Sequence, residues 1–199
     1  MKHIIFAFAI VTISLAACEN AGNKSAENKK RNDTIQFDNS LQRGATTANV
    51  STSKVDKAMK GMVAQYLQIK NALANDNGKD AANAGNAFVE SMREMDKTSL
   101  PADKKKVWDN IADDAKEMAE HIGKNAGKLD HQREHFDMLS NDMYDLVKSF
   151  KSGQTLYQTF CPMYNNKKGA AWLSETKEIR NPYLGKKMSA CGSVKEEIK

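Results

Sequence analysis

Between residues 54 and 152, mostly apolar residues recur at alternating intervals of three and four positions. This spacing places side chains along one face of an α-helix. Turn-forming runs at 75–78, 100–101 and 123–127 divide the pattern into four stretches, which predict an all-α, antiparallel four-helix bundle with short connections. The repeating positions are Val55, Met59, Met62, Tyr66, Ile69, Leu73; Ala81, Ala84, Phe88, Ser91, Met95; Trp108, Ile111, Ala115, Met118, Ile122; and Leu129, Gln132, Phe136, Leu139, Met143, Leu146, Phe150.

The chain contains ten methionines, a number that invites a metal-transport interpretation. Most of them fall on or beside the apolar faces, and a flexible thioether side chain fills irregular gaps in a core well. We therefore interpret the helical methionines as core residues. They are Met59, Met62, Met92, Met95, Met118, Met138 and Met143.

The pattern changes after Gly153. Residues 156–161 alternate and are rich in β-forming residues, and Pro162 ends that run. Turn-forming residues at 165–169 and 181–185 break up the remainder. We expect the segment 156–198 to be loop-rich, with a short strand or helical turns, and to pack on the helices.

The N-terminus has the features of an export signal. A short basic start is followed by an apolar run from Ile4 to Ala17, which is too short to span a bilayer. It ends in Leu-Ala-Ala-Cys, and this resembles the bacterial lipobox, in which the cysteine becomes the lipid-bearing first residue of the mature protein. We expect a signal peptide at 1–17, lipidation at Cys18, a flexible tether over 18–53 and a folded domain at 54–199. The lipid would anchor the protein in the cell envelope, at the outer membrane facing the periplasm.

Net charge and motifs narrow the classes of function. The formal net charge is +5, and the basic residues are spread along the chain instead of forming a concentrated patch. We therefore expect no nucleic-acid partner. The sequence contains no nucleophile elbow, zinc-protease motif, phosphate loop or C-x-x-C pair, so we expect a protein that is not an enzyme.

Four sulfur-bearing side chains stand out in the C-terminal segment. Cys161 and Met163 lie at one end, and Met188 and Cys191 lie at the other. Thiolates and thioethers are soft ligands, and this combination selects Cu(I) over hard cations. Histidine can supplement such a site. His135 and His131 are spaced i, i+4 on the fourth predicted helix, with surface positions as the alternative, and His121 on the third predicted helix is a weaker candidate.

The same two thiols have a second use. In an exported protein, Cys161 and Cys191 can form a disulfide. They are 30 residues apart, and closing a loop of that size stabilises a fold by roughly 3–4 kcal/mol in the chain-entropy model. A non-catalytic structural or interaction module, with its C-terminal segment held by this disulfide, therefore remains the alternative to a metal site.

Several runs of the chain form a distinctive set: Phe160-Cys161-Pro162-Met163, Gly169-Ala170-Ala171-Trp172-Leu173-Ser174, Glu178-Ile179-Arg180-Asn181-Pro182-Tyr183-Leu184-Gly185, Cys191-Gly192 and His131-Gln132-Arg133-Glu134-His135-Phe136. Together they resemble an uncharacterised bacterial lipoprotein domain that occurs appended to periplasmic adaptor subunits of copper and silver efflux pumps. The resemblance implies handling of copper or another heavy metal in the envelope, and a heavy-metal efflux system as partner. Cys161, Met163, Met188 and Cys191 match its sulfur positions, with His135 as an addition; the oligomeric state stays open.

Overall fold

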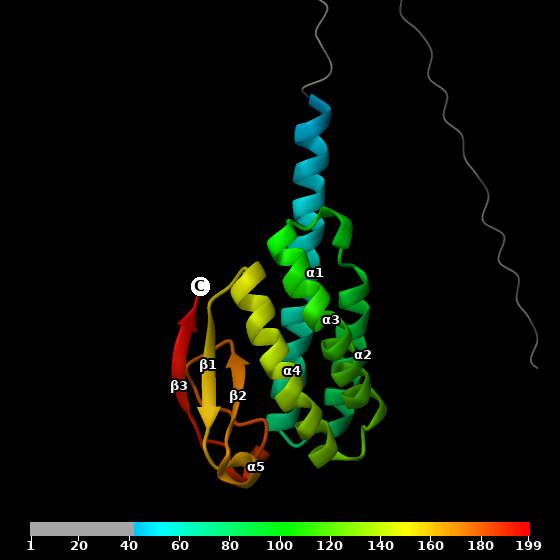
Figure 1. Ribbon diagram of the computed structural model, residues 1–199. Coiled ribbons are helices and arrows are strands. Elements are labelled where there is room, and N and C mark those ends of the chain that lie inside the picture. Colours follow the sequence, from blue (N-terminus) through cyan, green and yellow to red (C-terminus); the bar gives the residue numbers. More distant parts are fainter. Residues whose placement is uncertain (1–41) are drawn as a thin grey trace, which may run out of the picture. The chain divides into compact units, whose positions relative to one another are not determined.

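The computed structural model describes residues 42–199, with side chains described from residue 54 onward. Most of this part is helical (Figure 1). Its four long helices coincide with the four predicted stretches: α1 Gln42–Ala74, α2 Gly78–Arg93, α3 Ala102–Lys124 and α4 Leu129–Phe150. A short 3₁₀ helix, η1 Lys97–Ser99, lies between α2 and α3.

The buried faces of these helices are largely those that the spacing predicts. Tyr66, Phe88 and Phe136 are fully buried, and each occupies a repeating position. Successive helices pack against one another, and α1 also contacts α4. Local signals set some of the boundaries: the Asn77 side chain accepts a hydrogen bond from the backbone N–H of Asp80 at the start of α2.

Two of the methionines assigned to the core do not lie fully inside it. Met138 is 45% exposed, so its assignment was wrong. It lies outside the repeating positions of α4, on the outer side of the helix. Met118 is half-buried at the edge of the core, beside a histidine.

The C-terminal segment contains more regular structure than the sequence predicts. It forms a three-stranded antiparallel sheet in the order β2-β1-β3, not a single short strand with turns. In β1, Tyr157 pairs with Ser174 of β2 and Glu197 of β3. The elements are β1 Leu156–Cys161, the short α5 Tyr164–Lys167, β2 Ala170–Ser174, η2 Gly185–Met188 and β3 Ser193–Ile198.

Buried polar contacts join the sheet to the helices. The Tyr66 hydroxyl on α1 lies 2.8 Å from the Ser140 hydroxyl on α4 and accepts a hydrogen bond from the backbone N–H of Leu173 on β2. Arg133 on α4 donates to the carbonyl oxygen of Pro182, in the loop between β2 and η2, at 3.0 Å. These contacts fix the C-terminal segment against α1 and α4.

Several predictions fall outside the described residues. They are the signal peptide at 1–17, lipidation of Cys18 and the part of the tether before residue 42. Helix α1 begins at Gln42, so residues 42–53, predicted as tether, are helical. Of the described helices, none combines the length and the apolar character that crossing a membrane requires.

Candidate metal site

Three imidazole rings from two helices converge on one side of the helical layer. His121 belongs to the last turn of α3, while His131 and His135 belong to α4. One nitrogen of each ring lies within 4.8 Å of those of the other two. Within the described part of the chain, this is the one group of three or more His, Cys, Asp or Glu side chains close enough to share a metal ion.

The distance between two of the ring nitrogens is close to that between two ligands of one metal ion. The Nε2 atoms of His131 and His135 are 3.1 Å apart. Two nitrogens bound tetrahedrally to one ion at normal metal–nitrogen distances would be about 3.3 Å apart. His121 stacks on His135, with ring centroids separated by 4.2 Å, and this places the third imidazole beside the same pair.

His135 is the most buried member of the group, at 9% exposed. Burial, together with the neighbouring His121 and His131, lowers its pKa from the usual value. The neutral imidazole is the form that binds a metal ion. The environment of His135 therefore favours the ligand form over the imidazolium at neutral pH.

Carboxylates lie beside the two more exposed rings. Nδ1 of His131 is 3.5 Å from Glu134, and Nε2 of His121 is 3.7 Å from Glu117. A carboxylate at one ring nitrogen fixes the tautomer and leaves the other nitrogen for a metal ion. For His131 the nitrogen left over is Nε2, which is the atom that faces His135.

A thioether completes the surroundings. The Met118 sulfur, on α3 one turn before His121, lies 3.2 Å from Nδ1 of His135. The sulfur contacts Nδ1, whereas Nε2 of the same ring faces His131, so the thioether positions the His135 ring instead of sharing the candidate ion. The three imidazoles suit copper, zinc or nickel.

The sulfur-bearing residues of the C-terminal segment are arranged differently. The sulfurs of Cys161 and Cys191 are 2.8 Å apart, and both cysteines are free thiols. Met163 and Met188 are 47% and 40% exposed, and their contacts with Cys191 are through the backbone. The structure brings the two thiols together, and it places His135 in the imidazole group, which contains neither cysteine.

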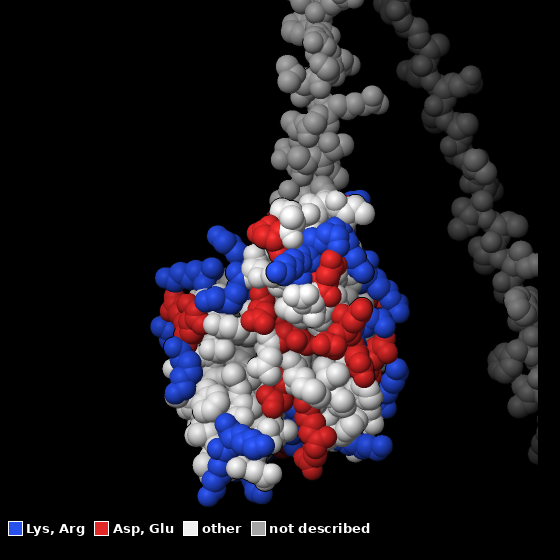
Figure 2. All heavy atoms as spheres, viewed as in Figure 1, with Lys and Arg blue, Asp and Glu red and all other residues white. Residues whose placement is uncertain are grey.

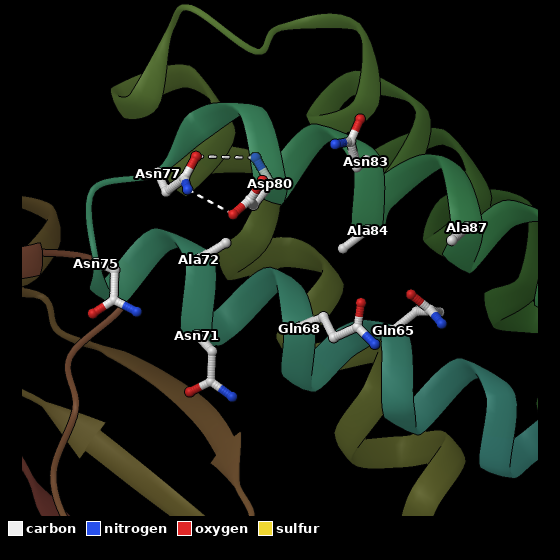
Figure 3. Close-up of a pocket in the computed structure, with 10 residues that line it drawn as sticks. All are labelled: Gln65, Gln68, Asn71, Ala72, Asn75, Asn77, Asp80, Asn83, Ala84 and Ala87. Atoms are coloured by element: carbon white, nitrogen blue, oxygen red, sulfur yellow. Dashed lines mark hydrogen bonds between the residues drawn. The ribbon is translucent and has the colours of Figure 1, made fainter.

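A groove of about 550 Å³ lies between α1 and α2, and none of its lining residues belongs to either group (Figure 3). Amide side chains line it, including Gln65, Gln68 and Asn83. Other amides at its edge are engaged by the C-terminal segment: Asn71 donates to Glu175 and Asn75 accepts from Arg180. None of the residues that line the groove is a histidine or a cysteine.

Sequence reasoning identified part of the imidazole group. The i, i+4 spacing of His131 and His135 was a usable signal, whereas His121 was the weakest candidate of the three. His121 has no second histidine one turn away on its own helix. The available signal was the short, glycine-containing turn at 123–128, which reverses the chain and places the end of α3 beside the start of α4.

The family model described as "Protein of unknown function (DUF3347)" matches residues 62–155. The match covers the C-terminal part of α1, all of α2 to α4 and the three histidines, and it ends one residue before β1. Neither curated proteins nor solved structures gave a match. The chain is thus similar over its helical part to a domain of unknown function, and the expected lipoprotein and efflux-adaptor associations stay predictions.

Proposed function

We propose that this chain binds a soft transition-metal ion, with Cu(I) as the first candidate, through His121, His131 and His135. The observation that carries the proposal is the convergence of these three rings from two helices to within 4.8 Å. Imidazole nitrogens grouped in this way are ligands that copper, zinc and nickel accept.

The charge of α4 favours a cation. The helix carries five carboxylates against the basic side chains Arg133 and Lys148. On the face in Figure 2, acidic side chains extend over the middle of the molecule, while basic side chains gather towards the ends and sides. A negative surface beside a ligand group raises the local concentration of cations.

The wider role rests on the sequence. In this proposal the protein is an envelope lipoprotein, anchored through Cys18, that holds copper or transfers it to a heavy-metal efflux system. The support is the apolar leader with its lipobox-like end and the resemblance described above. Metal binding by the imidazole group does not depend on that location.

Anaerobic titration of the purified protein with Cu(I), against a competing chelator, tests the proposal. The informative variants are His121→Gln/His131→Gln and, as the matched control, Cys161→Ser/Cys191→Ser. The side chains of His121 and His131 are 42% and 39% exposed, so their replacement leaves the core intact. We expect one Cu(I) per chain, at least about 10-fold weaker binding in the histidine variant, and unchanged binding in the cysteine variant.

Other results would contradict the imidazole site in separate ways. Binding lost only in the cysteine variant would move the site to the sulfur-bearing residues Cys161, Met163, Met188 and Cys191. No binding by a folded wild-type protein would reject the metal function altogether. The alternative, a non-catalytic structural or interaction module, would then be left, and the close approach of Cys161 and Cys191 favours it.

A further inference from the structure

Cys161 and Cys191 lie at one end of the β1–β3 ladder. Cys161 is the last residue of β1, and Cys191 lies two residues before the start of β3. Phe160 pairs with Ser193, so the chain positions just beyond this pair face each other. The two sulfurs are 2.8 Å apart although 30 residues of sequence separate them.

The sulfur separation fits bond formation better than metal binding. Two thiolates bound tetrahedrally to one zinc-sized ion would be about 3.8 Å apart, given metal–sulfur distances near 2.3 Å. A disulfide requires a separation of about 2.05 Å. The sulfurs have already approached more closely than a shared ion permits, and a small side-chain movement closes the remaining gap.

The loop that carries Cys191 is held by its own hydrogen bonds. The fully buried Asn181 donates its side-chain N–H to the carbonyl oxygen of Cys191 at 2.7 Å. Its backbone N–H donates to Ser189, and its side-chain oxygen accepts from the backbone N–H groups of Tyr183 and Leu184. The position of Cys191 is thus fixed without a covalent bond, and closing the bond requires little rearrangement.

The two thiols differ in access. Cys161 is fully buried, whereas Cys191 is half-buried and reaches solvent. An oxidant can therefore reach only one of the two sulfurs in the folded protein.

We infer that Cys161 and Cys191 form an intramolecular disulfide in a fixed order, in which Cys191 reacts with the oxidant and Cys161 completes the bond. The oxidant is a small disulfide or a disulfide-exchanging protein. The Cys191 thiolate attacks the disulfide, forms a mixed disulfide and releases one thiol. Cys161 then attacks the Cys191 sulfur and releases the second thiol, so that the two protein thiols are oxidised and one disulfide is reduced to two thiols.

The electrostatics of the pair indicate a structural bond instead of a fast redox catalyst. The hydrogen bond with Cys161, followed by burial, raises the pKa of the Cys191 thiol. Little thiolate is present at neutral pH, so the first attack is slow and speeds up with increasing pH. The inference is independent of the imidazole site, which contains neither cysteine.

Single variants separate the two roles. We would treat reduced, folded Cys161→Ser and Cys191→Ser proteins, each in a Cys18→Ser background so that Cys18 forms no adduct, with oxidised glutathione and follow each by intact-mass spectrometry. Cys161→Ser should accumulate a stable Cys191–glutathione adduct, because the resolving thiol is missing. Cys191→Ser should remain unmodified until urea exposes Cys161.

The parent protein with both Cys161 and Cys191, in the same Cys18→Ser background, should lose the mass of two hydrogen atoms, retain no adduct and melt roughly 10 °C higher than its reduced form. Equal labelling of both single variants in the native state would overturn the order. A parent protein that keeps both thiols free with oxidised glutathione would overturn the disulfide. An unchanged melting temperature after oxidation would overturn its stabilising role.

Discussion

Lys70 offers the sharpest test of how the sheet is attached to the helices. It lies on α1, is only 1% exposed, and its ammonium group donates at 2.6 Å to Glu175, directly after β2. Burial lowers the Lys70 pKa, and the Glu175 carboxylate opposes that effect. We predict that Glu175→Gln destabilises the protein more than Lys70→Met does.

The magnitude follows from the different exposure of the two partners. Removing one partner of a fully buried ion pair typically costs 3–5 kcal/mol. Glu175 is 36% exposed, so water partly solvates the ammonium that remains, and we expect a loss of about 2 kcal/mol for Glu175→Gln. Lys70→Met keeps the apolar volume and leaves a carboxylate that reaches solvent, so its effect should remain within about 1 kcal/mol.

Urea denaturation of the wild type, both single variants and the double variant at pH 7 and pH 9.5 measures these differences. In Glu175→Gln, Lys70 lacks its counter-charge, and its folded pKa lies below its unfolded pKa. The folded state then prefers the neutral amine, so stability returns as the pH rises through the folded pKa, and the deficit should shrink at pH 9.5. A Lys70→Met variant as unstable as Glu175→Gln, or a deficit that does not change with pH, would refute the reasoning.

Two further predictions concern α4 and the turn before β2. Burial, with Asp114 and Asp145 nearby, raises the pKa of Asp142 to about 6. The folded state therefore holds the proton more tightly than the unfolded state, and the resulting stability is lost as the pH rises from 4 through 6. We expect Asp142→Asn to be more stable than the wild type by about 1 kcal/mol at pH 7.5, a value that allows for solvent screening, and no more stable at pH 3.5. Denaturant titration at both pH values measures the difference, and a variant as stable as the wild type at both would contradict this. Gly169 has φ +81°, and a Cβ there would lie 3.0 Å from the Cys161 carbonyl oxygen, so Gly169→Ala should cost about 2 kcal/mol. A thermal melt indistinguishable from that of the wild type would show that the turn relaxes more easily than expected.

Local patterns accounted for the helices. The i, i+3, i+4 spacing on each stretch requires only that neighbouring turns of one helix share a face, which is a property of the backbone. It even placed Gln132 on the buried face, where its side chain donates to the carbonyl oxygens of Gly78 and Ile122. Met138 departed from the prediction because it is a hydrophobic residue at a position of α4 that lies outside the buried face.

The sheet was harder to predict because its pairing is not local. Residues 156–161 read as a strand, but β3 has the sequence Ser-Val-Lys-Glu-Glu-Ile, whose exposed charges give no clear alternation. It forms an edge strand because β1 offers unpaired backbone groups on that side. Edge strands bury few side chains, so their sequences carry a weak signal.

The sequence by itself determined the helical segments, their buried faces and the types of side chain available for metal or disulfide chemistry. Only the tertiary structure decided which of those side chains meet. It brought His121 across from α3 to the pair on α4, and it joined Cys161 to Cys191 while leaving Met163 and Met188 largely exposed. The physical reason is that a helical face is encoded within a few residues, whereas the meeting of distant side chains depends on how helices and strands pack over the whole chain.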